Sequence, residues 1–156
     1  MSHGATSTRC NARWRKRTER GFSRRPALMT PDRWTLARDT GALPRVEGRC
    51  VAFMARGDAD LAALGASEIL AVQGFRPDHD KLRARGIDVV PRLEDQSGFD
   101  AALVQIVKSR VGTLSAVAET LSVVRPGGLI LIDGAKEEGI EAILKALRAQ
   151  VALEGV

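Results

Sequence analysis

The stretch Phe99–Gly139, FDAALVQIVKSRVGTLSAVAETLSVVRPGGLILIDGAKEEG, decides the fold. Residues 101–107 are almost wholly apolar and too few for a helix, which predicts a strand buried on both faces. Residues 110–124 have the periodicity of a helix, and residues 125–128 (RPGG) end it before a second apolar strand at residues 129–133. The predicted apolar face of this helix consists of Val111, Leu114, Val117, Ala118, Leu121 and Val124.

A strand, a crossover helix and a second strand form a βαβ unit, which closes into a parallel sheet. The same alternation runs through the sequence before this unit. Further strands are predicted at residues 49–55, 68–73 and 87–90, the last near a sheet edge because Pro91 follows. Further helices are predicted at residues 30–38, around Leu61 and Leu64, and at residues 77–85 and 140–151. The prediction is an α/β protein with a Rossmann-like, mostly parallel sheet, helices on both faces and an incomplete C-terminal edge.

The composition excludes several classes of protein. The chain has 156 residues, enough for one domain with a substantial core, and its apolar runs are too short to span a membrane. The two cysteines, Cys10 and Cys50, are far apart and predict neither a zinc site nor a disulfide framework. We expect a reduced, cytoplasmic setting and no membrane partner.

The positive charge is concentrated at the start of the chain. Residues 1–28 contain eight basic groups and one acidic group, a balance of +7, so the remaining residues carry 24 − 8 = 16 basic and 19 − 1 = 18 acidic groups. We expect a disordered basic tail at residues 1–28 and an α/β domain at residues 29–156. Three interpretations of the tail stay open: an arm that binds RNA phosphates, an organelle transit peptide, or upstream sequence before a natural start at Met29.

In an open α/β sheet, ligands bind beyond the carboxyl ends of the strands, at the point where the strand order reverses. The loop after the first predicted strand contains a single glycine, Gly57, followed by Asp58, where a nucleotide site needs several glycines. The second predicted strand ends in Gln73, where an acid would hold ribose hydroxyls. Gly57 and Gln73 are the candidate cofactor-binding residues. The simpler alternative is that Gly57 belongs to a structural turn.

Lys108 and Arg110 follow the central strand and are the candidate RNA-binding residues, with a solvated loop as the alternative. Asp78-His79-Asp80 resembles a metal cluster, but adjacent helical residues point in different directions and acids favour a helix start, so we predict helix capping. Residues 136–138 are predicted to form an exposed loop. The sequence contains no Ser-His-Asp, P-loop or zinc-spacing pattern, so no catalytic or metal-binding residue is predicted.

The order of elements, with FDAALV, RPGG and LILIDG, resembles that of class I S-adenosylmethionine-dependent methyltransferases. More specifically, residues 73–80 (QGFRPDHD) and 133–140 (DGAKEEGI) resemble the amino-terminal half of bacterial 16S rRNA guanine-N2 methyltransferases. The resemblance covers the chain from about Thr35 to the end.

Those enzymes contain two methyltransferase-like domains, of which the carboxyl-terminal one binds the cofactor and carries an Asn-Pro-Pro-Phe motif. The amino-terminal one is a degenerate copy that supports folding and RNA engagement. Here Val107-Lys108-Ser109-Arg110 stands where the motif would be. The resemblance implies S-adenosylmethionine for the full-length family and no cofactor bound by this chain. It also implies a catalytic domain that is missing or separate, and rRNA or the small ribosomal subunit as partners.

A second hypothesis is a non-enzymatic Rossmann-like interaction module whose missing sheet edge is completed by a partner. The two hypotheses differ in whether a catalytic half with an Asn-Pro-Pro-Phe motif follows downstream.

Overall fold

A computed structural model describes residues 33–153, and the expectations for the basic tail lie outside these residues. The elements in chain order are α1 (Arg33–Asp39), β1 (Arg49–Phe53), the 3-10 turn η1 (Leu61–Leu64), β2 (Glu68–Val72), α2 (Arg76–Ala84), β3 (Asp88–Val90), β4 (Phe99–Gln105), α3 (Arg110–Val123), β5 (Val124–Asp133), the 3-10 turn η2 (Lys136–Glu138) and α4 (Ile140–Arg148).

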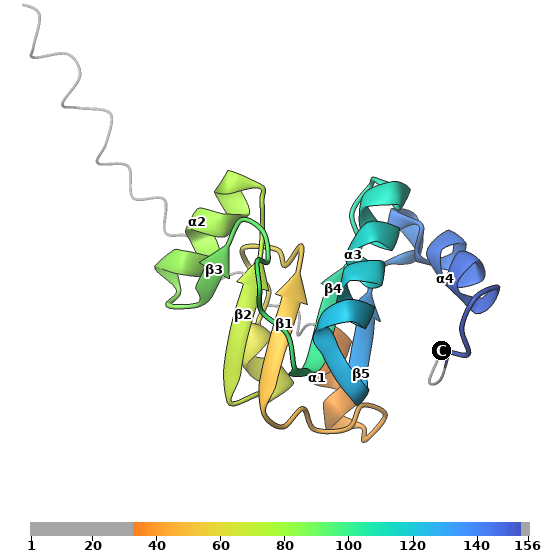
Figure 1. Cartoon of the computed structure of the whole chain (residues 1–156), viewed down its shortest axis with the longest axis horizontal. Helices are drawn as coiled ribbons and strands as arrows, with labels where there is room; N and C mark the ends of the chain where they lie inside the picture. The colour runs from red at the N-terminus through yellow and green to blue at the C-terminus, as the bar shows by residue number, and fades with distance from the viewer. Residues whose placement is uncertain (1–32, 154–156) are drawn as a thin grey trace, which may run out of the picture. The chain divides into compact units, whose positions relative to one another are not determined.

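The five strands form one sheet in the order β3-β2-β1-β4-β5, and every pair is parallel. Figure 1 shows β1 and β4 at the centre of the sheet. The predicted Rossmann-like fold is therefore confirmed, including the edge position of β3. The strand order reverses between β1 and β4, which places the expected ligand crevice beyond the carboxyl ends of these two strands.

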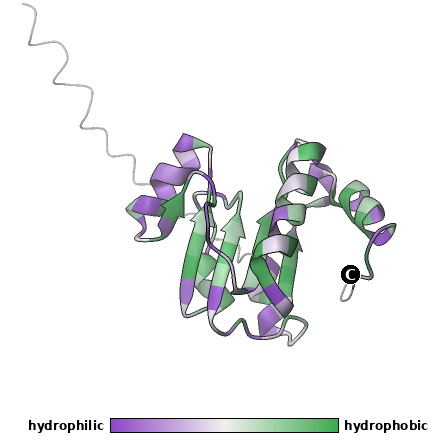
Figure 2. Ribbon diagram, viewed as in Figure 1, coloured by the Kyte–Doolittle hydropathy of each residue, from purple (hydrophilic) through white to green (hydrophobic). Residues whose placement is uncertain are grey.

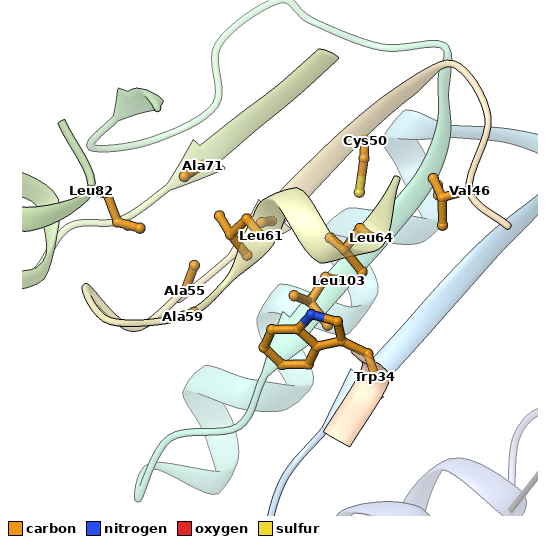
Figure 3. Packing of buried hydrophobic residues seen from close by; sticks show 12 residues of the cluster. Trp34, Val46, Cys50, Ala55, Ala59, Leu61, Leu64, Ala71, Leu82 and Leu103 are labelled. Atoms are coloured by element: carbon orange, nitrogen blue, oxygen red, sulfur yellow. The ribbon is translucent and has the colours of Figure 1, made fainter. Parts of the chain in front are cut away.

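Two apolar clusters cover the two faces of the sheet. Trp34 of α1, Leu61 of η1 and Leu82 of α2 pack on one face, against strand residues that include Leu103 (Figure 3). Residues of α3 and α4 pack on the other face. Because both faces are covered, the middle parts of the central strands are apolar, as the green in Figure 2 shows, and their polar residues lie near the strand ends.

Cys50 lies in β1 and is completely buried. Burial raises the pKa of its thiol to about 12, so the side chain acts as a small apolar core group. Cys10 lies outside the described residues.

At the amino ends of the strands, Asp100 joins three strands. Its carboxylate accepts a hydrogen bond from the Arg49 backbone N–H at 2.8 Å and one from Arg125 Nε at 2.7 Å. These bonds hold the pKa of Asp100 below its ordinary value. The aspartate thereby fastens β1 and β5 to β4 at the end of the sheet opposite the expected ligand crevice.

The helix predicted around Leu61 and Leu64 is a single 3-10 turn, ended by Gly65 in the left-handed conformation with φ of +81°. Both leucines are nevertheless buried in the core. A single turn suffices to cover the sheet because α1 packs beside it, with Trp34 Nε1 donating to the Asp60 carbonyl oxygen at 3.2 Å.

The predicted apolar face of α3 is wrong in part. Val117 is buried, but Val111 and Leu121 are 76% and 59% exposed, and α3 instead packs on the sheet through a face that includes Thr113 and Thr120. Both hydroxyls donate to carbonyl oxygens of the helix or the residue just before it, so both threonines can be completely buried.

No helix among residues 33–153 has the length and apolar character needed to cross a membrane.

Candidate functional site

The loop after β1 lies at the expected crevice, and α2 holds it in place. The Gly57 backbone N–H donates to Asp78 Oδ1 at 3.1 Å. Arg85 Nη1 donates to the carbonyl oxygens of Gly57 at 3.0 Å and Ala59 at 2.7 Å. A Cβ atom added at Gly57 would lie 2.7 Å from Lys81 Cβ, so the loop and α2 are in close contact. Two backbone N–H groups that a nucleotide loop would offer to a ligand are therefore bonded within the protein, that of Gly57 to Asp78 and that of Arg56 to Gln105.

Gln73 lies at the end of β2, is buried, and uses both ends of its amide inside the protein. Its Nε2 donates to the Ala55 carbonyl oxygen at 2.8 Å, and its Oε1 accepts from the Phe75 backbone N–H at 2.9 Å. The side chain thus joins the end of β1 to the start of α2. Gly57 is in the loop after β1, and Gln73 bonds to the same loop through the Ala55 carbonyl oxygen.

A second polar group lies beyond the carboxyl ends of β1, β4 and β5. We call it the edge cluster, and it consists of Arg33, Arg56, Gln105, Asp133 and Glu138.

Asp133 is the centre of the edge cluster, and its side chain is only 9% exposed. Its carboxylate accepts from Arg33 Nε at 2.7 Å and from Gln105 Nε2 at 3.1 Å, and it pairs with Arg56 Nη2 at 3.4 Å. Gln105 is itself buried, and its Oε1 accepts from the Arg56 backbone N–H at 2.8 Å. These bonds link the loop after β1 to the last residues of β4 and β5.

Glu138 completes the edge cluster from η2. Its carboxylate accepts from the Ala135 backbone N–H at 2.6 Å and from Arg56 Nη1 at 2.6 Å. The backbone bond is the main cause that lowers the pKa of Glu138 below its ordinary value of 4.5, and the nearby arginines add to it. Residues 136–138 are therefore a 3-10 turn fastened by Glu138, which corrects the prediction of a simple exposed loop.

The edge cluster makes stability sensitive to acid. Because the pKa of Glu138 is lower in the folded chain, its contribution is present above pH 4.5 and is lost as the pH falls through the folded-state value. Asp100 acts in the same direction. We expect the thermal unfolding midpoint to fall progressively from about pH 5 to about pH 3. In the Glu138→Gln variant, the slope of the thermal midpoint against pH over this range should be shallower than in the parent chain.

The matched control is Glu137→Gln, which changes the exposed neighbouring acid. It should leave the slope as it is in the parent chain. Equal slopes for the parent chain and the Glu138→Gln variant would contradict the assignment.

Lys108 and Arg110 are exposed and follow β4, at the point where the strand order reverses. Between them, Ser109 caps α3, because its Oγ accepts the Gly112 backbone N–H at 3.1 Å. Within residues 33–153 neither cation has an ion-pair partner. The structure places them at the carboxyl edge of the sheet, separate from the hydrogen bonds that hold Gly57 and Gln73.

Asp78-His79-Asp80 lies at the start of α2, and the Asp78 side chain points away from the other two. Asp78 reaches the loop after β1, whereas His79 Nδ1 lies 3.2 Å from Asp80 Oδ1. The predicted capping is not what the structure shows for Asp78, because its carboxylate bonds to another loop and not to its own helix. Among the described residues, no group of three or more His, Cys, Asp or Glu side chains could hold a metal ion.

The residues that could bind the S-adenosylmethionine implied by the resemblance do not fit that molecule as they stand. The Gly57 amide and both ends of the Gln73 amide are bonded within the protein, and Lys81 packs against the glycine. An adenosyl group would have to displace these bonds without an evident replacement for them. We therefore derive no chemical step through the cofactor.

The sequence matches no protein-family model, and no curated protein is significantly similar to it. Among solved structures, the N-methyltransferase NodS from Bradyrhizobium japonicum WM9 is similar in fold, with a TM-score of 0.54 and 13% sequence identity. The match covers 73% of this chain and 80% of the NodS chain. At this identity, the likeness establishes a methyltransferase-like fold.

Proposed function

We propose that this chain is the degenerate amino-terminal domain of a 16S rRNA guanine-N2 methyltransferase. Its role is to support a catalytic half and to bind rRNA, and it is inactive by itself. The proposal rests on two observations together. The fold is methyltransferase-like, but the loop after β1, where the cofactor would bind, is hydrogen-bonded to Asp78 and Arg85. The resemblance of residues 73–80 and 133–140 to that enzyme family supplies the substrate class.

The hydrogen bonds of the edge cluster support a structural role for its residues. The edge cluster joins α1, β4 and the loops after β1 and β5 through side chains that pair with one another. Such a network stabilises the positions of these loops, but its groups are engaged and supply no free base or nucleophile. A domain whose polar groups are paired in this way can support an enzyme whose chemistry takes place in another domain.

Lys108 and Arg110 are the residues we assign to RNA. They are exposed, unpaired among the described residues, and lie at the sheet edge where ligands of this fold bind. Two cations on a fixed loop and helix start can neutralise RNA phosphates, which gives binding without base recognition. The buried amide of Gln73 has no role in this contact.

Binding of protein-free 16S rRNA by the full chain tests this assignment. The double change Lys108→Glu with Arg110→Glu should weaken binding about tenfold or more and reduce the salt dependence by about two counterions. The matched control is Lys145→Glu with Arg148→Glu on α4, which makes the same charge change at exposed positions elsewhere. Because both variants keep residues 1–28, any contribution of the basic tail is the same in both.

The control variant should retain most of the affinity of the parent chain. Equal weakening by the two double changes would show a general charge effect and contradict the assignment of Lys108 and Arg110. Unchanged binding by the Lys108 and Arg110 variant would contradict it as well.

A further inference from the structure

Phe75 is an exposed aromatic residue whose backbone is held in place. It is 62% exposed, whereas the other phenylalanine and tryptophan residues within 33–153 are buried. Phe75 is the N-cap residue of α2, and its backbone N–H donates to Gln73 Oε1 at 2.9 Å. Its carbonyl oxygen accepts the backbone N–H of His79 at 3.0 Å. Because these bonds involve only the backbone of Phe75, they hold the residue in position and leave its ring accessible.

Exposed cations lie on both sides of Phe75 along the carboxyl edge of the sheet. The strand order β3-β2-β1-β4 places the loop after β3 on one side of Phe75 and the loop after β4 on the other. Arg92 follows β3, whereas Lys108 and Arg110 follow β4. Arg92 is exposed and, like the other two cations, has no ion-pair partner within residues 33–153. The edge therefore presents an aromatic ring between positive charges.

The strands set the distance between Phe75 and the cations after β4. Neighbouring strands are about 4.8 Å apart, so the ends of β2 and β4, with β1 between them, are about 10 Å apart. Roughly three nucleotides span this distance at about 3.4 Å per nucleotide. Asp58, in the loop after β1, is exposed and negatively charged. We therefore expect phosphates to contact the cations at the two ends of this row and not its middle.

We propose that Phe75 stacks on an unpaired base of single-stranded RNA, while the cations on either side of it contact the flanking phosphates. A polyanion suits the cations, and an unpaired, unstacked base offers a flat face to the ring. In a duplex, neighbouring bases cover those faces. This inference rests on the proposed function, because it takes RNA as the partner, and it adds a base contact to the phosphate contacts already assigned.

Binding of a fluorescent oligoribonucleotide to the full chain tests the stacking. The probe is a single strand of about ten nucleotides without internal pairing, and the same strand annealed to its complement is the duplex probe. Phe75→Leu keeps an apolar side chain but removes the aromatic face, so it should weaken binding of the single strand about tenfold. It should leave the affinity for the duplex unchanged. Because it removes no charge, it should also leave the salt dependence of single-strand binding unchanged.

Two further variants separate stacking from a general loss of apolar surface. Phe75→Trp retains an aromatic face and should keep the affinity for the single strand within about twofold of the parent chain. Val111→Ala is the matched control, because Val111 is an apolar residue of α3 near the same edge and is 76% exposed. It should leave the affinity unchanged. Because all these changes are at exposed positions, the thermal midpoints of the variants should stay close to that of the parent chain.

The inference is overturned if Phe75→Leu binds the single strand as tightly as the parent chain does. Equal weakening by Phe75→Trp, or by Val111→Ala, would overturn it as well. The double change Lys108→Glu with Arg110→Glu separates this inference from the proposed function. If the double change weakens binding and Phe75→Leu does not, the assignment of RNA stands and the stacking is wrong; if the parent chain binds no RNA, both are wrong.

Discussion

Replacing Leu103 by alanine is expected to lower the free energy of unfolding by about 3 kcal/mol, within the range for a fully buried leucine. Leu103 lies in the middle of β4 and is only 1% exposed, and it packs in the same cluster as Trp34 and Leu61 (Figure 3). The substitution removes apolar contacts and leaves a cavity at the centre of the sheet. Since a domain of this kind has about 5–15 kcal/mol of stability in total, the loss is a large fraction of it.

Urea unfolding of the full chain measures this effect. Leu36→Ala is the control, because it makes the same chemical change at a leucine that is 59% exposed. The control should change stability by less than about 0.5 kcal/mol. If the two substitutions cost the same, Leu103 would not be at the centre of the core as described.

Replacing Gln73 by glutamate is the second large effect that we expect, at about 2–4 kcal/mol of destabilisation near neutral pH. The change retains the oxygen that accepts the Phe75 N–H, but it replaces the donor to the Ala55 carbonyl oxygen by a carboxylate oxygen. Two oxygens would then face each other in a buried position, and a negative charge would lose its hydration. The substitution also restores the acidic residue that a ribose site would have at this place.

The pH dependence of the stability loss in the Gln73→Glu variant shows whether the buried charge causes it. Burial should raise the pKa of the new carboxyl in the folded chain, and its protonated form can donate to the Ala55 carbonyl oxygen. The stability difference from the parent chain should therefore narrow as the pH falls and widen as it rises. The control is Gln96→Glu, at an exposed position in the loop before β4, which should be nearly neutral. A difference that does not vary with pH would contradict this account.

Much of the fold could be predicted from the sequence, because the buried parallel strands are short apolar runs that glycine and proline residues separate. Residues 129–133 and 101–107 were recognisable in this way, and the structure extends β5 back to Val124. The orientation of α3 could not be predicted by the same rule. Hydrophobic periodicity counts Thr113 and Thr120 as polar, although their hydroxyls are satisfied by local carbonyl groups.

The contacts of the candidate residues could not be predicted from the sequence. The sequence identifies Gly57 and Gln73 from their places at strand ends; the structure places Gly57 in the loop after β1 and Gln73 at the end of β2, bonded to that loop. The edge cluster was not predicted, because Arg33 and Asp133 are 100 residues apart in the chain. The available signal was the position of Asp133 and Gln105 at the ends of neighbouring strands, where parallel strands bring their last residues together.

Because the groups of Gly57 and Gln73 that would meet a cofactor are bonded within the protein, we expect that this domain does not bind S-adenosylmethionine. Calorimetric titration of the full chain with S-adenosylmethionine tests it most directly, after a cooperative thermal transition has shown that the chain is folded. We expect no saturable heat and no shift of the thermal midpoint at millimolar S-adenosylmethionine. Saturable binding in the micromolar range would contradict it, and would show that the bonds of Gly57 and Gln73 open to admit the cofactor.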